Sequence, residues 1–327
     1  MIDVTLDEIE AVSYDSIRAH GAQDWIATSM AKAVRRAEET GNIICGLYYL
    51  ESYCTQLKSG RVDGNADPVV AKPRPGSVLA DAKLGFAQPA FERAMPQVVS
   101  AARENGIAAL GVAHSHTCTS LGYFTEQLAN QGLLAIGFTN ASPVVAAPGG
   151  KNRVIGTNPI AYSVPGRDGG VAVHFDAATS ATALGAITMA KSAGRDIPLG
   201  WAVDSNGDET TDPSAALEGA LLSAGGYRGF GFGLLAEFLA AGMTGSVNSV
   251  DVSGLKLPDG KPHDLGQFYM VVDVSSMSDA FFDRFDRLED AIRYDEGARL
   301  PGAIRKSLDP VKVDPDLWAK LSSLAGR

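Results

Sequence analysis

The chain has 327 residues, 45% of them hydrophobic and 20% charged, which is enough for two compact units with full cores. Its 28 basic and 38 acidic residues give a net charge of −10, so electrostatics disfavours a nucleic acid or an anionic membrane as partner. The first ten residues are polar and acidic, and no run of about 18 uncharged apolar residues occurs. We therefore expect a cytoplasmic protein.

Both ends of the chain are predicted to be helical. Residues 5–8, Thr-Leu-Asp-Glu, have the form of a capping box and open a helix that should end near Gly21. Helical spacing of apolar residues recurs in Asp24–Thr40, Ile43–Leu57, Ser278–Arg293 and Asp314–Leu324.

Between these ends, strand patterns alternate with helical patterns, which favours an α/β domain. Predicted strands are Val69–Ala71, Ser77–Leu84, Ile107–Ala113, Leu134–Thr139, Val171–Phe175, Gly200–Asp204 and Gln267–Val274. Predicted helices are Gln88–Asn105, Leu121–Gln131, Thr179–Ala193, Leu217–Ser223 and Leu234–Ala241. We interpret the polar segment Ser246–Gly266 as an exposed loop.

The most informative stretch runs from Gly111 to Pro165. Its apolar start ends in two histidines, His114 and His116, and small hydroxylated residues follow where a strand gives way to a helix. Backbone N–H groups at such junctions lack partners within the helix, so they are available to a ligand. We interpret this stretch as one wall of a small-molecule site.

Histidine and cysteine usage predicts no metal centre. Two histidines without a nearby carboxylate do not complete a metal site, although one of them is a candidate proton donor. The three cysteines, Cys45, Cys54 and Cys118, form no Cys-x-x-Cys pair, and their number is odd. We expect reduced thiols. The other histidines, His20, His174 and His263, are interpreted as surface or satisfied core residues.

Two glycine- and hydroxyl-rich turns keep two interpretations each. Residues 229–233, Gly-Phe-Gly-Phe-Gly, lack the preceding strand of a dinucleotide fingerprint. These glycines either let two helices pack closely or bring Arg228 and a helix start to a phosphate. The turn Asp176–Ser180 is either an ordinary helix cap or a ligand site. In the second case its carboxylate would bind ribose hydroxyls and its free N–H groups a phosphate.

Several motifs spread over nearly the whole chain resemble one family. They are Val154–Ala161, Thr139-Asn140, Pro148–Gly150, Asp176–Ser180, Gly200–Asp204 with Thr210–Pro213, Gly226–Gly229 and Arg299–Gly302. Together they resemble the malate/L-lactate dehydrogenase-type NAD(P)-dependent reductases, which are unrelated to the Rossmann lactate dehydrogenases.

This resemblance implies a homodimer. Each subunit would combine a non-Rossmann, mixed-sheet α/β cofactor domain (residues 66–275) with a helical domain built from both termini (residues 1–65 and 276–327). It also implies NADPH or NADH as cofactor, with Thr157 near the substrate. We expect Thr157 and backbone donors near Asn158 to hold the substrate carboxylate. The implied cofactor contacts are Thr117, Cys118, Thr119, Ser120, Leu121, Asp176, Ala178, Thr179, Ser180, Arg228, Gly229, Pro301 and Gly302.

One segment departs from the family pattern. Members that reduce 2-oxo acids carry a Gly-His-Asp-Ser-His-Gly-type segment whose second histidine donates a proton, and an arginine shortly after it holds the carboxylate. Here the histidine is Cys45, its serine partner is Ile44, and the arginine position falls on Tyr49. The cofactor-side segment, commonly His-Phe-Gly, reads Thr-Cys-Thr at 117–119.

The loss of this acid favours a substrate that brings its own proton. Reducing a ketone without a positioned acid forgoes a contribution of about 10²–10⁴-fold, whereas a cyclic imine arrives protonated on nitrogen. The chain therefore looks like the Δ1-pyrroline-2-carboxylate and Δ1-piperideine-2-carboxylate reductases, and we expect NADPH-dependent reduction of these imines to L-proline and L-pipecolate.

Three residues are candidates for catalysis. His116 or Tyr49 is expected to give a hydrogen bond at the imine side, and Cys45 to line the ring pocket. Two alternatives stay open. The first is a 2-oxo acid or 2-hydroxy acid dehydrogenase that uses His116 as a displaced proton donor. The second is a catalytically silent member that binds a dinucleotide and acts in interaction or sensing.

Overall fold

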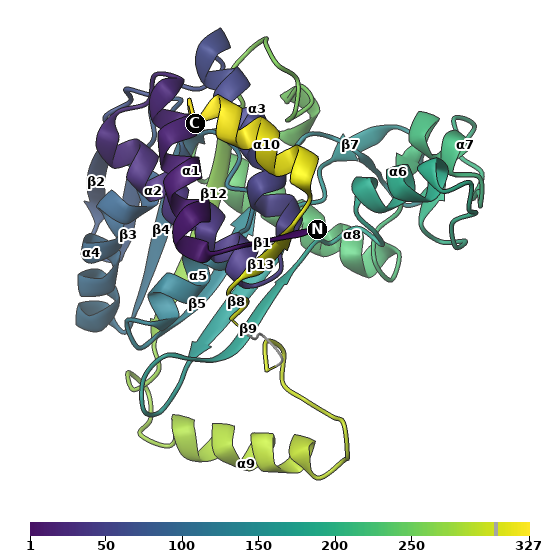
Figure 1. Ribbon diagram of the computed structural model, residues 1–327. Helices are drawn as coiled ribbons and strands as arrows, with labels where there is room; N and C mark the ends of the chain where they lie inside the picture. The colour runs from purple at the N-terminus through teal and green to yellow at the C-terminus, as the bar shows by residue number, and fades with distance from the viewer. Residues whose placement is uncertain (304–306) are drawn as a thin grey trace.

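A seven-stranded sheet is the largest element of the computed structural model, which describes residues 1–303 and 307–327 (Figure 1). The strand order is β2-β3-β4-β12-β5-β8-β9, and only β3 and β4 run parallel among the described neighbours. The bounds are β2 Val69–Arg74, β3 Ser77–Asp81, β4 Ile107–Ser115, β5 Leu133–Thr139, β8 Ile160–Pro165, β9 Val171–Ala177 and β12 Leu265–Asp273. A Rossmann sheet is mostly parallel, so this mixed sheet confirms the predicted non-Rossmann α/β class.

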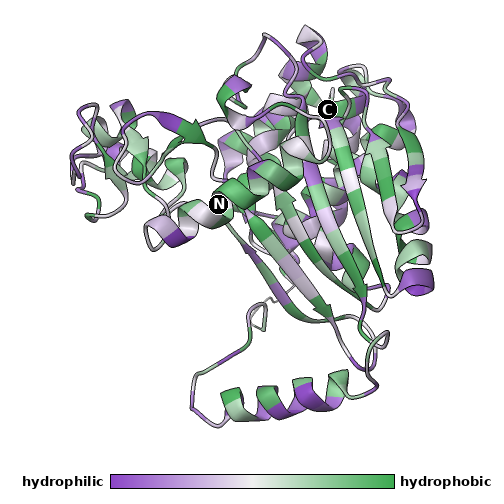
Figure 2. Cartoon of the chain, turned by 180° about the vertical axis from the view of Figure 1, so that it is seen from behind, coloured by the Kyte–Doolittle hydropathy of each residue, from purple (hydrophilic) through white to green (hydrophobic). Residues whose placement is uncertain are grey.

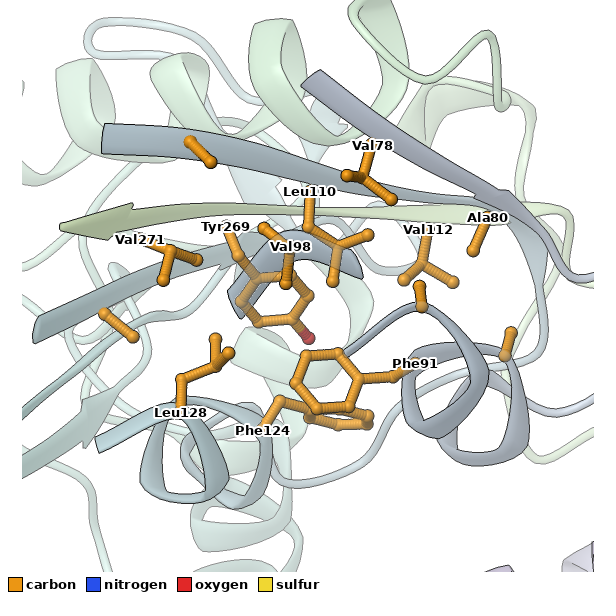
Figure 3. Close-up of a cluster of buried hydrophobic side chains, with 14 of the residues drawn as sticks. Val78, Ala80, Phe91, Val98, Leu110, Val112, Phe124, Leu128, Tyr269 and Val271 are labelled. Carbon is orange, nitrogen blue, oxygen red and sulfur yellow. The ribbon is translucent and has the colours of Figure 1, made fainter. Parts of the chain in front are cut away.

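The main core lies between one face of this sheet and two helices, α4 (Ala87–Asn105) and α5 (Gly122–Ala129) (Figure 3). At its centre the ring of Phe91 lies 5.0 Å from that of Phe124 and 5.2 Å from that of Tyr269, and both of these contacts are edge to face. Burying a side chain of this size stabilises the fold by about 1.5–3 kcal/mol. Figure 2 shows apolar stretches, in green, along the central strands of the sheet.

Both chain ends pack into a second, helical cluster. Its elements are β1 Ile2–Val4, α1 Leu6–Ala19, α2 Asp24–Glu39, α3 Leu47–Ser59, β13 Val311–Val313 and α10 Pro315–Leu324. The predicted capping box is confirmed, because Thr5 and Glu8 exchange hydrogen bonds at the start of α1, and β1 pairs antiparallel with β13.

The division at residues 65/66 and 275/276 stays a proposal. Phe86 packs in the helical cluster although it falls within the proposed cofactor domain. In both views α9 (Phe281–Arg293) lies apart from that cluster, below the sheet. Residues 304–306 of the proposed helical domain lie outside the described residues.

A small lobe beside the main sheet corrects two predicted helices. It contains the sheet β10-β11-β6-β7 with bounds β6 Val145–Ala146, β7 Arg153–Ile155, β10 Ala202–Val203 and β11 Ala220–Leu221, and the helices α6 Leu184–Ser192 and α7 Pro213–Glu218. The helix predicted at Leu217–Ser223 is wrong, because Gly219 passes directly against the backbone of Val203 and the chain continues as β11. The predicted helix Thr179–Ala193 begins only at Leu184.

The glycines at 229–233 do not separate two helices. They lie inside α8 (Tyr227–Glu237), which continues as a π-helical turn, Phe238–Gly242. A side chain at Gly229 would overlap the carbonyl oxygen of Ala224, and one at Gly233 would overlap Ile155. Close packing is therefore one use of these glycines.

The segment 246–266 is only partly the exposed loop that its polarity predicts. It contains a 3₁₀ turn, Ser249–Asp251, and the side chains of Ser249 and His263 are fully buried. Polar residues here pair with buried partners instead of water, which hydrophobic periodicity does not reveal. No helix of the described ranges is long and apolar enough to cross a membrane.

Candidate active site

Cys45 lies in the 3₁₀ turn Ile43–Cys45, directly before α3. Gly46 follows because Glu38 passes where a side chain would be, and the Glu38 carboxylate accepts the N–H of Leu47 at 2.7 Å. Burial raises the pKa of the Cys45 thiol to about 12, and the negative charge of Asp176 acts in the same direction. The thiol is therefore neutral at pH 7 and a poor acid.

Two buried tyrosines stand behind Cys45 on α3. The rings of Tyr49 and Tyr53 lie 5.0 Å apart, and burial raises the pKa of both phenols. The Tyr49 hydroxyl donates to the carbonyl of Leu255 at 3.3 Å, and that of Tyr53 donates to Thr119 at 3.2 Å. Both hydroxyls are engaged within the protein and neither ionises near neutral pH.

Asp176 connects the predicted cofactor segment 117–121 to the Cys45 turn. Its carboxylate accepts the N–H of Gly122, the first residue of α5, at 2.8 Å, and the Ser120 hydroxyl at 3.4 Å. Such a carboxylate is favoured at a helix N-terminus. Its charge also helps to raise the pKa of the buried Cys118, although burial is the larger cause.

The rest of this segment is mostly inward. Leu121 is fully buried, Thr117 is 8% exposed, and Thr119 adopts φ 59° while donating its hydroxyl to the Cys118 carbonyl at 2.6 Å. Asn42 donates to Ser120 at 3.4 Å, which brings the turn before α3 to the start of α5. Cys45, Asp176 and residues 117–121 thus form one group, which we call the Cys45 pocket.

His116 is buried behind this pocket instead of facing it. Only 1% of it is exposed, and its ring stacks on that of His263 at 4.0 Å. Gln56 donates to the carbonyls of Leu255 and Leu257, so its oxygen accepts, and the His116 Nε2 donates to it at 2.5 Å. Burial lowers the pKa of His116 well below its usual value, so it is neutral.

The second group of predicted residues lies at α8. Asn158 is fully buried, and its amide donates to the carbonyl of Gly233 at 2.9 Å and to Glu237 at 2.7 Å. The amide thus holds α8 in place. Thr157 is half-buried, and its carbonyl accepts the N–H of Thr179 at 2.9 Å. Of this pair, Thr157 is the one whose side chain has no partner assigned among the described hydrogen bonds.

Glu237 is a buried carboxylate satisfied by neutral donors. Besides Asn158 it accepts the backbone N–H of Ser249 at 3.0 Å, the Ser249 hydroxyl, and the Asn248 amide at 3.2 Å. The cluster ties α8 to the turn at 249–251.

The N-terminus of α8 fits a phosphate. Its N-cap is Gly226 at φ 65°, which supplies no capping side chain, and the first helical N–H groups lack intrahelical partners. The Ser223 hydroxyl beside it is buried without a hydrogen-bond partner among the described residues, and the Arg228 side chain is exposed. Ser180 pairs with Ser223 through a backbone bridge, so this predicted contact joins the same group, with Thr179 adjacent and Ala178 exposed.

Pro301 and Gly302 lie beside β9 at His174, which precedes Asp176 by two residues. The Pro301 carbonyl accepts the N–H of His174 at 3.1 Å, and Gly302, at φ 86°, contacts the His174 backbone closely. The structure therefore brings Pro301 and Gly302 to the β9 edge, whereas the buried His116 pairs with Gln56 and stacks on His263.

Sequence reasoning missed four polar residues that shape these groups: Gln56, Arg61, Glu237 and Lys256. Each acts on a partner about 80 to 200 positions away or on the segment 246–266, so no local spacing reveals it. The sequence offers one indirect signal. A charged or amide side chain within an apolar helical pattern, such as Gln56 in α3, is buried only when it has a hydrogen-bond partner. In the described ranges no three His, Cys, Asp or Glu residues are placed to hold a metal ion.

The buried histidine pair predicts acid sensitivity. Burial lowers the pKa of His263 to about 3, and that of His116 also falls. The unfolded chain binds these protons below pH ~6.5 and the folded chain does not, so stability is lost as pH falls from about 6.5 towards 3. We expect His263→Asn to make the loss between pH 6.5 and 5.5 shallower by about 1 kcal/mol in urea unfolding. Parallel profiles for the two proteins would contradict this reading.

Comparisons with known proteins agree with this geometry. Residues 4–321 match the family model described as malate/L-lactate dehydrogenase. The chain is 37% identical over 306 residues to the (2R)-3-sulfolactate dehydrogenase (NADP(+)) of Chromohalobacter salexigens, covering 93% of this chain and 91% of that protein. It is 35% identical over 312 residues to a Δ1-pyrroline-2-carboxylate/Δ1-piperideine-2-carboxylate reductase of Pseudomonas aeruginosa, covering 93% and 92%.

A solved structure shares the whole fold. The Δ1-piperideine-2-carboxylate reductase of Pseudomonas syringae pv. tomato superposes with a TM-score of 0.92 at 31% identity, covering 99% of this chain and 100% of that one. The family model spans nearly the entire sequence, and the relatives are oxidoreductases by name. The chain is an oxidoreductase that belongs to the malate/L-lactate dehydrogenase family.

Proposed function

We propose that this enzyme reduces anionic cyclic imines of the Δ1-pyrroline-2-carboxylate and Δ1-piperideine-2-carboxylate type by hydride transfer to C2. The observation that carries the proposal is the Cys45 pocket, which offers no effective acid. The Cys45 thiol has its pKa raised to about 12, the Tyr49 hydroxyl is engaged with Leu255, and His116 is buried and neutral.

The charge of Asp176 adds to this argument. A ketone gains negative charge on oxygen during reduction, which a nearby carboxylate disfavours. A protonated imine is a cation that becomes neutral during reduction, and a nearby carboxylate favours its binding in the charged form. Asp176, whose charge adds to the effect of burial on the pKa of Cys45, would thus favour an iminium over a ketone.

We propose NADPH as the cofactor, with NADH as the alternative. It would be held by the N-terminus of α8 with Arg228 and Gly229, by Ala178, Thr179 and Ser180, and by the pocket segment Thr117–Leu121 with Asp176. When bound, the nicotinamide supplies the hydride. Thr157 would contact the substrate, Cys45 would line the ring, and Pro301-Gly302 would border the site at β9.

A second candidate is favoured by one relative. The Chromohalobacter protein is named for a 2-hydroxy acid, (2R)-3-sulfolactate, and its identity to this chain is similar to that of the imine reductases. Such a reaction needs a group that accepts the hydroxyl proton in the oxidative direction.

Initial rates over a small substrate panel test the proposal. We expect kcat/KM for Δ1-pyrroline-2-carboxylate or Δ1-piperideine-2-carboxylate, with NADPH, to exceed that for pyruvate and oxaloacetate by about 100-fold or more, because only the imines bring the missing proton. The panel also includes 3-sulfolactate with NADP⁺, and each substrate is repeated with the NAD cofactor.

Cys45→Ala tests the role of the thiol, because a side chain that only lines the substrate ring is dispensable for turnover. It should keep imine turnover within about threefold, a change of less than ~0.7 kcal/mol. Faster turnover of an oxo or hydroxy acid than of either imine would overturn the proposal. NADPH binding without any turnover would instead identify a silent member of the family.

We also propose a homodimer, in which a second copy covers the hollow under α9. This hollow of about 880 Å³ lies between α9 and the sheet and has a mostly apolar lining that includes Phe281, Phe285 and Leu288. An exposed apolar surface of this kind marks an interaction site. Light scattering should give a mass twice that of the 34.1 kDa chain, and Phe285→Asp should lower the measured mass towards that of a single chain. A monomeric wild type would refute the dimer.

A further inference from the structure

The segment 253–261 is fixed to α3 by a set of buried donors. Arg61 is only 1% exposed, and its guanidinium donates to the carbonyl of Lys261 at 3.0 Å, to that of Leu257 at 2.7 Å and to the Ser253 hydroxyl at 2.7 Å. A guanidinium offers five donors in a rigid plane, so it fixes several backbone groups at once. This segment is therefore held in one conformation despite its polar sequence.

Two further side chains complete the attachment. Gln56 donates to the carbonyls of Leu255 and Leu257 at 2.8 and 2.7 Å, and Ser59 donates to that of Pro258 at 2.7 Å. Gln56 is itself oriented by His116. The buried histidine thus acts as a positioning residue for the segment, through Gln56.

The segment places Lys256 beside the Cys45 pocket, against the first turn of α3. Its ammonium lies 3.6 Å from the ring centre of Tyr48 and 5.1 Å from that of Tyr49, both on the first turn of α3. These are cation–π distances. The ammonium is also close enough to Cys45 to lower the pKa of its thiol, although burial outweighs this effect.

Among the described residues, Lys256 has no carboxylate partner. Its ammonium makes none of the ion pairs within 4.0 Å that the described residues form, and its side chain is exposed. A cation held on aromatic rings beside the Cys45 pocket, without a counter-ion among the described residues, is suited to an anionic ligand.

We propose that Lys256 binds the carboxylate of the substrate, in place of the arginine that the family pattern has at the position of Tyr49. The inference rests on the proposed function, since it assigns the anionic end of the imine to this side chain. Lysine binds as a point charge on a flexible stem, so it accepts carboxylates on rings of different size, whereas an arginine fork fixes one geometry.

The test compares an imine that carries a carboxylate with one that lacks it. We expect Lys256→Met to raise KM for Δ1-pyrroline-2-carboxylate about 10- to 100-fold, the range for a charge-assisted hydrogen bond, with a smaller change in kcat. Reduction of 2-methyl-Δ1-pyrroline, which lacks the carboxylate, should not be weakened in the variant. Lys256→Arg should keep most of the affinity. Lys261→Met is the matched control, since it removes a charge from the same segment and leaves the carbonyl that Arg61 binds.

The outcomes separate the two proposals. If the wild type reduces the imine and Lys256→Met leaves KM unchanged, the inference is overturned and the proposed function stands. If the wild type reduces no imine, binding of pyridine-2-carboxylate, a flat anion that cannot be reduced, is measured by calorimetry in the presence of NADPH. Weaker binding by Lys256→Met alone then supports the anion site, and equal binding by all variants overturns it.

Discussion

Burial that keeps side chains neutral is the constraint on which this site depends. Cys45, Tyr49, Tyr53 and His116 all carry groups able to move a proton. Burial raises the pKa of the thiol and the two phenols and lowers that of the imidazole, so none is an effective acid at neutral pH. The carboxylate of Asp176 and the ammonium of Lys256 are both close enough to Cys45 to affect the pKa of its thiol. A pocket arranged in this way selects a ligand by its charges and provides no acid of its own.

The fold explains how these charges reach one place. Asp176 lies on β9, the edge strand of the large sheet, and caps α5 through Gly122. Cys45 stands before α3 in the helical cluster, and Lys256 stands on a segment that returns to α3. Three parts of the chain more than 75 residues apart therefore lie near Cys45, and the buried Arg61 and the His116–Gln56 pair hold the segment that carries Lys256.

The sequence predicted the elements with strong periodicity and the family-specific motifs. The helices α1, α2 and α4 and the strands of the main sheet follow their hydrophobic patterns, and the capping box at Thr5 is as its spacing indicates. The predicted helix at 217–223 failed because Gly219 must pass against Val203, a tertiary contact that propensity does not contain. The 229–233 glycines were misplaced for the same reason: their role is close approach to Ala224 and Ile155 within one helix.

The sequence named residues that the structure brings close together, but not the contacts that those residues make. Motif resemblance located Cys45, Asp176 and the start of α8, while the orientation of His116 and Asn158 depends on partners 60 and 79 positions away. The polarity of the segment 246–266 indicated exposure, whereas Arg61 and Gln56 satisfy its carbonyls and fix Lys256.

The pH dependence of kcat/KM for the five- and six-membered imines tests the central claim most directly. If the substrate carries the proton, each profile should fall as pH rises through the pKa of that imine in solution, and the two profiles should be displaced by the difference between those values. A single profile shared by both rings, set by a group of the enzyme, would contradict the account.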